Sequence, residues 1–146
     1  WHYYWKATNL AGLTDHVIAV LADHAYRAGS PRSYAAMFHM GGAVARVPHD
    51  ATAYAGRGVA HTMSIDGVWL PDESGELAAA ESAWAQRFLQ ALQPHRAGVY
   101  VNFLDSDDDS SRVREAYGDH FPRLAEVKAK YDPENAFHHN KNISPA

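Results

Sequence analysis

Apolar side chains recur every three to four residues in two long stretches of the chain, which is the spacing of one face of a helix. The clearer stretch covers residues 76–92, and its repeated positions are Leu77, Ala80, Trp84, Phe88 and Leu92. Pro94 ends this predicted helix, because proline cannot continue the helical hydrogen bonds. A second helix is predicted over residues 13–28, with Gly29 and Pro31 as the residues that stop it.

Other stretches are short, mostly apolar and extended in pattern. They are predicted as strands over residues 34–39, 43–47, 61–69 and 99–104, with residues 1–5 as the end of a further strand. Gly41 and Gly42 separate two of these strands. Mixed helices and strands in this order predict an α+β fold, in which helices cover an antiparallel sheet.

The last third of the chain predicts two more helices. Residues 111–117 form a short helix closed by Gly118. Pro122 opens another helix, which runs to Tyr131 and stops before Pro133.

Composition excludes several classes of partner. A chain of 146 residues with 47% apolar residues can build the core of one domain. The net charge of −4 gives no general attraction to nucleic acid or to anionic membranes, and no apolar run approaches the roughly 20 residues of a membrane helix. Cysteine is absent, so this chain can form neither disulfides nor zinc–thiolate sites, and the compartment stays open. Because the chain begins with Trp1 rather than Met, we expect a fragment or a processed product.

The run VYVNFLDSDDDSSRVREAYGDHFPRLAEVKAKYDPENAFHHNKNISP, residues 99–145, combines a Tyr-x-Asn segment with a YDPENxF tail. It resembles the C-terminal segment of the berberine bridge enzyme-like FAD-linked oxidases, within the vanillyl-alcohol oxidase superfamily. The earlier run GGAVARVPHDATAYAGRGVAH, followed by Trp69, resembles the substrate domain of the same family. The resemblance implies that residues 1–98 are part of a substrate-binding domain and residues 99–146 the C-terminal segment. The tail would then pack on an N-terminal FAD-binding domain that this chain lacks.

Tyr100 and Asn102 are the leading candidates for chemistry. Residues two apart in a strand face the same side, so both side chains can address one ligand. The resemblance implies that Tyr100 removes the substrate proton while hydride leaves for the flavin, and that Asn102 hydrogen-bonds near the flavin. An ordinary phenol, with a pKa of about 10, needs nearby positive charge or hydrogen bonds to act as a base near neutrality.

The resemblance implies that the tail returns to the flavin, so that at least one of Asn140 and Asn142 contacts FAD. An amide donates and accepts hydrogen bonds at once, which suits the pyrimidine edge of a flavin. The alternative is that both residues cap the loop end through backbone hydrogen bonds, as Asn often does in turns. No GxGxxG motif or P-loop occurs in the chain, so it has no phosphate cradle of its own.

A second catalytic group is not assigned by the sequence. Some relatives carry a carboxylate or glutamine on the strand that ends near Trp69, and the nearby residues here are Thr62, Ser64 and Asp66. His39 lies on a neighbouring predicted strand and is a further candidate for the substrate pocket. A surface or hydrogen-bonded histidine is the alternative at His39.

The acidic run that starts at Asp105 does not fit a calcium-binding EF-hand. With Asp105 as the first position, Ser110 stands where glycine is required and Ala116 where a bidentate glutamate is required. We expect a solvated loop whose acids precede a helix. The ten histidines show no HExxH or HxH spacing, so no metal site is predicted. Phe137 is expected to anchor the tail in a core.

The sequence therefore predicts the C-terminal portion of an FAD-dependent oxidoreductase. The reaction would be oxidation of an alcohol or amine-bearing carbon, in a sugar or a secondary metabolite. The alternatives are a non-catalytic binding or assembly module, and a fragment without independent activity. An FAD-binding half in upstream sequence or in a partner chain would favour the enzyme.

Overall fold

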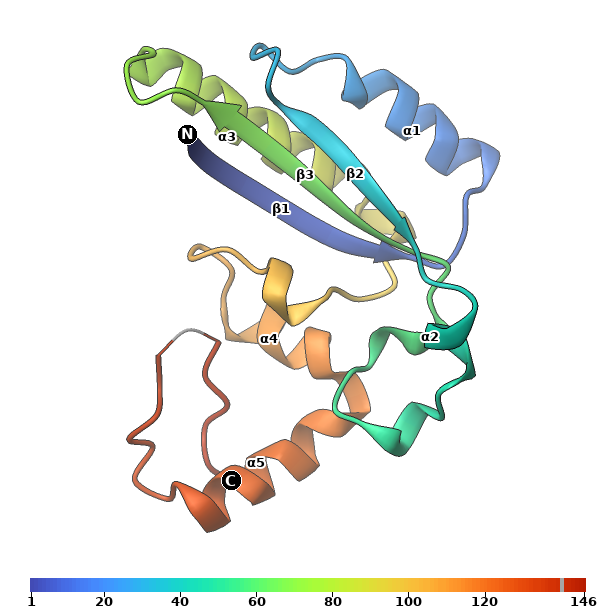
Figure 1. Ribbon diagram of the computed structural model, residues 1–146, viewed down its shortest axis with the longest axis vertical. Helices are drawn as coiled ribbons and strands as arrows, with labels where there is room; N and C mark the ends of the chain where they lie inside the picture. Colours follow the sequence, from blue (N-terminus) through green and yellow to red (C-terminus); the bar gives the residue numbers. More distant parts are fainter. Residues whose placement is uncertain (140) are drawn as a thin grey trace.

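A three-stranded antiparallel sheet organises the computed structural model, which describes residues 1–139 and 141–146 (Figure 1). Its strands are β1 (His2–Leu10), β2 (Tyr34–His39) and β3 (His61–Trp69), in the spatial order β1-β3-β2. The predicted bounds of β2 and β3 are confirmed, whereas β1 is longer than predicted. β3 is mostly buried because it pairs on both edges.

Helices α1 (Asp15–Ala25) and α3 (Gly75–Ala91) cover one face of this sheet (Figure 1). Each begins at a hydroxyl cap: Thr14 Oγ1 accepts from the Val17 amide at 3.2 Å and Ser74 Oγ from the Leu77 amide at 3.2 Å. The core between helices and sheet contains Leu10, Val17, Met63, Ile65, Trp84, Ala85, Phe88 and Leu92. Burying each large apolar side chain contributes about 1.5–3 kcal/mol, so this layer is a main source of stability.

A buried carboxylate fastens the segment before β2 to α3. Glu81 is fully buried, and its Oε1 accepts from the amides of Gly29 at 2.7 Å and Ser30 at 3.0 Å. Its other oxygen accepts from the Ser33 hydroxyl, which in turn accepts from the Val68 amide at 2.9 Å. The charge is thus satisfied by donors from the chain that leads into the edge strand.

The C-terminal part packs on the other side of the sheet (Figure 1). It contains the short 3₁₀ helix η4 (Val101–Phe103), α4 (Ser110–Tyr117) and α5 (Phe121–Tyr131). A second hydrophobic core joins it to β1, with Ala7, Val99, Leu104, Val113, Ala116, Phe121 and Ala125 as its buried members. The two predicted helices are confirmed to within a residue at their starts.

The predicted strand over residues 99–104 is wrong. Only the preceding segment pairs with β1, through Asn9 N to Gly98 O and Ala97 N to Asn9 O, both at 2.8 Å. The chain then leaves the sheet edge, so no strand partner is available. It turns instead into η4, closed by Phe103 N to Tyr100 O at 2.9 Å.

The predicted strand over residues 43–47 is also wrong, because α2 (Ala43–Arg46) forms there. Gly42 precedes it with φ of 62°, a backbone conformation that favours glycine and turns the chain away from β2. Two short 3₁₀ turns, η1 (His49–Ala51) and η2 (Gly56–Gly58), follow before β3. This segment therefore forms a lobe beside the sheet rather than an added strand.

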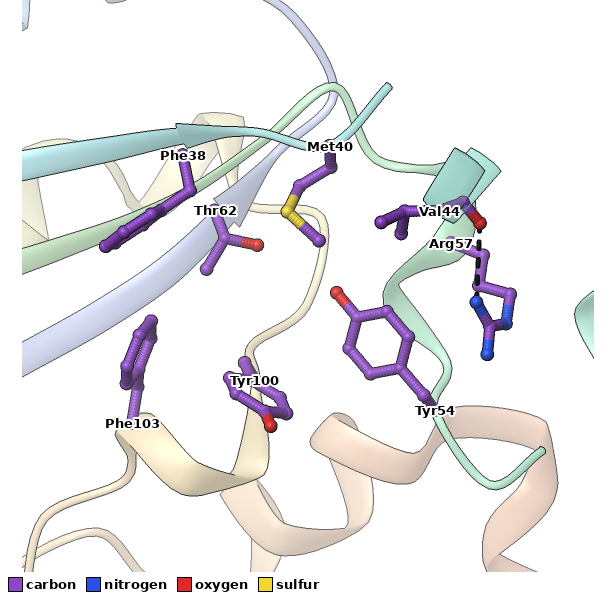
Figure 2. Close-up of a pocket in the computed structure, with 8 residues that line it drawn as sticks. All are labelled: Phe38, Met40, Val44, Tyr54, Arg57, Thr62, Tyr100 and Phe103. Atoms are coloured by element: carbon purple, nitrogen blue, oxygen red, sulfur yellow. Dashed lines mark hydrogen bonds between the residues drawn. The ribbon is translucent and has the colours of Figure 1, made fainter. Parts of the chain in front are cut away.

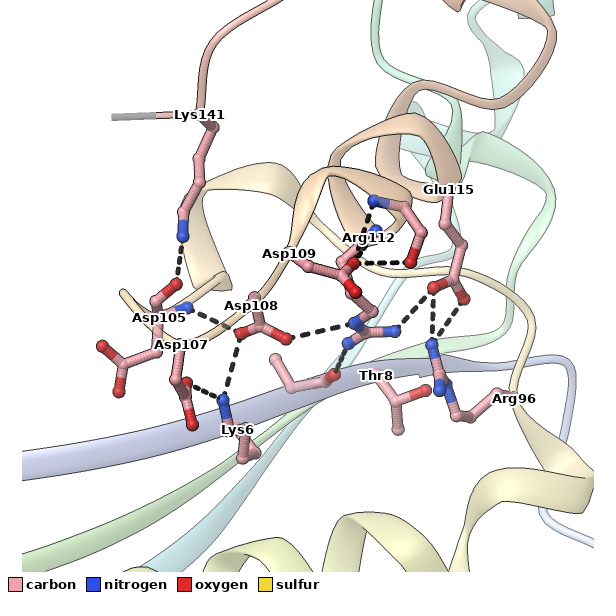
Figure 3. Close-up of polar contacts among 12 residues, drawn as sticks. Lys6, Thr8, Arg96, Asp105, Asp107, Asp108, Asp109, Arg112, Glu115 and Lys141 are labelled. Carbon is pink, nitrogen blue, oxygen red and sulfur yellow. Dashed lines mark hydrogen bonds and ion pairs between the residues drawn. The ribbon is translucent and has the colours of Figure 1, made fainter. Parts of the chain in front are cut away.

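Two local expectations are corrected. The acidic loop is not simply solvated, because Asp107 and Asp108 bind Lys6, and Asp108 also pairs with Arg112 (Figure 3). Asp109 does cap α4, accepting from the Ser111 amide at 2.9 Å. Phe137 is 83% exposed and anchors no core, and the tail meets the second core only later, through Ile143.

Candidate functional site

A pocket of about 440 Å³ lies between η4 and the sheet face that is turned away from α1 and α3 (Figure 2). Its lining residues are Phe38, Met40, Val44, Tyr54, Arg57, Thr62, Tyr100 and Phe103. They come from three separate segments: the sheet, the 43–58 lobe and the C-terminal segment. The walls are mostly apolar, and phenols, a hydroxyl and a guanidinium supply the polar groups.

The sheet contributes to the pocket wall through one pair of residues that face each other on β2 and β3. Phe38 of β2 stands opposite Thr62 of β3, so their side chains share the face toward η4. The Thr62 hydroxyl donates to Asn9 Oδ1 at 2.8 Å. This bond fixes the Thr62 rotamer and leaves its oxygen free to accept from a ligand.

Tyr100 lies at the centre of the opposite wall (Figure 2). Its ring meets Tyr54 edge-on at 5.5 Å between centroids and Phe103 edge-on at 5.3 Å, so two aromatic rings fix its position. Asn102 Nδ2 donates to the Tyr100 hydroxyl oxygen at 2.7 Å. The structure therefore brings the predicted pair together through the turn of η4, although the strand on which that expectation rested does not form.

Arg57 ties the parts of the 43–58 lobe to one another beside the pocket. Its guanidinium donates to Val44 O at 3.3 Å and to Thr52 Oγ1 at 2.8 Å, and it lies over the Tyr54 ring at 5.4 Å. Burial raises the pKa of the Tyr54 hydroxyl, and Tyr100 adds to this, whereas Thr62 and the Arg57 charge oppose it. Sequence analysis missed Tyr54 as a pocket residue, although the Thr-Ala-Tyr run before Arg57 was a usable signal.

A second hollow of about 340 Å³ lies beside the first on the same face of the sheet. It contains three of the predicted residues, Ser64, Asp66 and Asn102, together with Trp5, Tyr34, Ala36, Phe38 and Phe103. Phe38 and Phe103, with ring centroids 5.9 Å apart, line both hollows. The two hollows are therefore adjacent, with one aromatic pair shared between them.

Asp66 gives this second hollow its acidic group. Ser64 Oγ donates to Asp66 Oδ2 at 2.6 Å, as their common strand parity allows. Burial raises the pKa of Asp66 above its ordinary 3.8, and the bond from Ser64 opposes the shift. At neutral pH the carboxylate can accept a hydrogen bond from a substrate hydroxyl or amine.

His39 is not brought into either hollow. Its position on β2 has the opposite parity to Phe38, so it faces the other side of the sheet, where its ring lies 5.3 Å from that of His61. The ring of His39 is exposed, as in the alternative interpretation of this residue as a surface histidine. The expected role in the substrate pocket has no geometric support.

Of the two tail amides predicted to bind the flavin, the structure describes one. Asn140 lies outside the described residues. Asn142 lines a third hollow of about 560 Å³, which also contains Trp5, Leu104 and Lys141. Its Oδ1 is buried and accepts no hydrogen bond from the described residues.

These amides fit the ring end of a flavin. The unpaired Asn142 Oδ1 can accept from an N–H group, and the exposed Asn102 amide is within reach of a ligand on the open face. The chain carries no motif for the pyrophosphate, so these residues can hold only one end of the cofactor.

Comparison with known proteins identifies relatives of this chain. Residues 99–144 match the family model "Berberine and berberine like". The uncharacterized FAD-linked oxidoreductase YvdP of Bacillus subtilis is 34% identical over 135 residues, which cover 91% of this chain and 29% of that protein. The chitooligosaccharide oxidase of Gibberella zeae is 38% identical over 61 residues, 41% of this chain and 12% of that protein.

Solved structures share the fold. The glycopeptide hexose oxidase DBV29, complexed with teicoplanin, superposes with a TM-score of 0.81 and 26% identity over 98% of this chain and 32% of that one. The fold and the matched segment define a class of protein, the one that carries the berberine-type C-terminal segment. The chain belongs to the berberine bridge enzyme-like family, whose cofactor is FAD. It spans about 29% of the length of its Bacillus relative.

None of the helices formed by residues 1–139 and 141–146 is both long enough and apolar enough to span a bilayer.

Proposed function

We propose that this chain forms the substrate-side wall of an FAD-dependent oxidoreductase that oxidises a hydroxyl-bearing carbon. The observation that carries the proposal is the position of Tyr100, whose hydroxyl accepts from Asn102 at 2.7 Å beside a pocket of about 440 Å³. Residues 1–98 would supply the sheet wall and residues 99–146 the wall that bears Tyr100. Oxidation of an amine-bearing carbon would follow the same chemistry.

In this proposal Tyr100 is the base. FAD, when bound, accepts the hydride from the substrate carbon. Tyr100 takes the proton of the reacting hydroxyl, so that one C–H bond and one O–H bond break as the carbonyl forms. The hydrogen bond from Asn102 fixes the direction of the phenol oxygen. The rings of Tyr54 and Phe103 keep the phenol in place during this transfer.

A sugar is the substrate class that the two hollows support best. Aromatic faces pack against the C–H surfaces of a sugar ring, and Trp5, Tyr34, Phe38 and Phe103 supply such faces. Asp66 and Thr62 supply acceptors for hydroxyl groups. The chitooligosaccharide and hexose oxidases among the relatives are consistent with this class.

The remainder of the enzyme would be an FAD-binding portion, from the same polypeptide or from a partner chain. The tail that contains Asn142 would pack against that portion and contact the flavin ring. Two exposed aromatic side chains would be covered by such packing: Tyr131 at the end of α5, which is 74% exposed, and Phe137 in the tail, which is 83% exposed.

Replacing Tyr100 with Phe in the assembly of this chain with an FAD-binding portion tests the proposal. We expect FAD to stay bound while the rate of flavin reduction by substrate falls about 10²- to 10⁴-fold, which is the usual contribution of a general base. Stopped-flow absorbance of the flavin band measures that rate. Tyr26→Phe, at a tyrosine that is 91% exposed and lies outside the pocket, is the matched control and should keep the wild-type rate.

Two outcomes would contradict the proposal. Unchanged reduction in the Tyr100→Phe variant would remove Tyr100 from the mechanism. An assembly that retains no flavin band through gel filtration would instead favour a non-catalytic module.

A further inference from the structure

Two histidines from distant parts of the sequence meet on the helix-covered side of the molecule. His16 lies in the first turn of α1, and His95 ends the 3₁₀ turn η3 (Gln93–His95) that follows α3. His16 Nδ1 and His95 Nε2 are 3.2 Å apart, whereas the ring centroids are 4.9 Å apart. The two nitrogens therefore face each other rather than lying on opposite sides of stacked rings.

This separation matches two ligands of one metal ion. Imidazole nitrogens bind Zn²⁺ at about 2.0–2.1 Å, so two nitrogens on one ion are roughly 2.9–3.4 Å apart for angles between 90° and tetrahedral. Imidazole is also a preferred ligand of Zn²⁺, Cu²⁺ and Ni²⁺. We propose that His16 and His95 bind a divalent transition-metal ion that clips α1 to the turn after α3.

The other histidine pairs of the described residues do not have this geometry. His49 and His120 are stacked face to face, with centroids 4.5 Å apart and an interplanar angle of 30°, and no ring nitrogens in hydrogen-bond contact. His39 and His61 are 5.3 Å apart between centroids, also without such a contact. The adjacent rings of His138 and His139, 4.9 Å apart between centroids, also lack such a contact. Among the described residues, only His16 and His95 bring two histidine ring nitrogens within hydrogen-bond distance of each other.

The surroundings leave room for an ion with an incomplete protein shell. His16 is exposed and His95 half-exposed, so water can occupy the remaining coordination positions. No third His, Asp or Glu joins them to make a three-ligand group among the described residues. The neighbouring cation, Arg96, is turned away, because its guanidinium binds Glu115 at 2.6 Å.

Spacing along the chain could not reveal this site, because its ligands are 79 positions apart. The clip is also separate from the flavin chemistry, since α1 and η3 lie on the helix-covered side and Tyr100 on the other. Its expected effect is on stability: an ion that binds the folded chain and not the unfolded one raises the melting temperature with concentration.

Titration of the untagged chain with ZnCl₂, followed by calorimetry, tests the site. We expect one Zn²⁺ per chain, and at least a tenfold loss of affinity in each of His16→Ala and His95→Ala. His49→Ala removes one histidine from a stacked pair and serves as the matched control, with wild-type affinity. Thermal unfolding with and without Zn²⁺ should show an upward shift in the wild type and in His49→Ala only.

Because both ligands are near the surface, circular dichroism should show that the two alanine variants fold. If either variant does not, His16→Gln tests the same ligand with less change in shape. Binding of Zn²⁺ that is equally strong in the wild type and in the His16 and His95 variants would overturn the proposal. So would the absence of one-to-one binding by the wild type.

Discussion

At the scale of single residues, the buried carboxyl group of Asp66 should make the stability of the fold depend on pH. Burial raises its pKa above 3.8, so the folded chain holds this proton to higher pH than the unfolded chain does. The unfavourable ionisation therefore makes the folded state lose stability as pH rises from about 4 through the raised pKa. Asp66→Asn removes that ionisation and keeps an acceptor for Ser64. We expect the variant to be more stable than the wild type at pH 7.

Urea unfolding between pH 4 and pH 8 measures this difference. The advantage of Asp66→Asn should shrink toward pH 4, where the wild-type carboxyl is increasingly protonated. Asp72→Asn, at an exposed turn, is the control and should follow the wild-type curve. A pH-independent advantage of Asp66→Asn would mean that its effect comes from packing and not from ionisation.

Individual residues also show where sequence analysis succeeded and where it failed. Tyr100 and Asn102 were predicted as neighbours because of strand parity, yet a single turn of 3₁₀ helix joins them. Parity on β3 correctly places Ser64 beside Asp66 because that strand does form. Tyr54 could not be placed from local pattern, since only the tertiary position of the 43–58 lobe brings it to the pocket.

At the scale of elements, the close approach of α3 to β3 depends on Gly67. A Cβ atom at this position would lie 3.0 Å from the Glu81 carbonyl oxygen and 3.1 Å from Glu81 Cβ. Because the obstacle is largely backbone, Gly67→Ala must push the helix away from the sheet. We expect a loss of about 1–3 kcal/mol in the free energy of unfolding, typical of overpacking.

Chemical denaturation of Gly67→Ala against Gly75→Ala tests this requirement. A Cβ at Gly75 meets no atom within 4 Å, and this residue opens α3, so alanine there should be neutral or slightly stabilising. Equal stability of the two variants would show that α3 can shift at no cost.

Elements with local signals were predictable, and those that depend on a partner were not. α1 and α3 carry a cap, a periodic apolar face and a stop residue, all of them local in sequence. Residues 43–47 and 99–104 have the apolar composition of strands, but no free sheet edge is available to them. A strand is defined by its neighbour, and a single sequence does not contain that information.

At the scale of the whole molecule, two hydrophobic cores on opposite sides of the sheet are joined by an ionic network at β1 (Figure 3). Burial alone would lower the pKa of Lys6, but its bond to Asp107 and the charge of Asp108 raise it above 10.5. Burial would raise the pKa of Asp107, but the bonds from Lys6 and Tyr4 lower it below 3.8. The stability that the charged Lys6 adds to the folded state is therefore lost only as the pH rises above about 10.5. The stability that the ionised Asp107 adds is lost only as the pH falls below about 3.8.

Arg112 is the residue of this network whose loss should separate the two cores. Its guanidinium donates to Ala7 O at 2.9 Å and pairs with Asp108 at 3.2 Å and Glu115 at 2.7 Å, while its side chain is only 12% exposed. Arg112→Ala leaves these acceptors poorly satisfied next to β1. We expect a loss of about 3–5 kcal/mol in the free energy of unfolding, which is the range for removing one partner of a buried ion pair.

The loss should be confined to one side of the molecule. Hydrogen exchange followed by mass spectrometry should show reduced protection in residues 99–131 of Arg112→Ala, with the strands and α3 still protected. Arg123→Ala, at an exposed arginine of α5, is the control and should leave the pattern unchanged. Uniform loss of protection in Arg112→Ala would instead mean that both cores unfold as one cooperative unit. The Tyr100 wall could then not move without the sheet, and the pocket would open only by global unfolding.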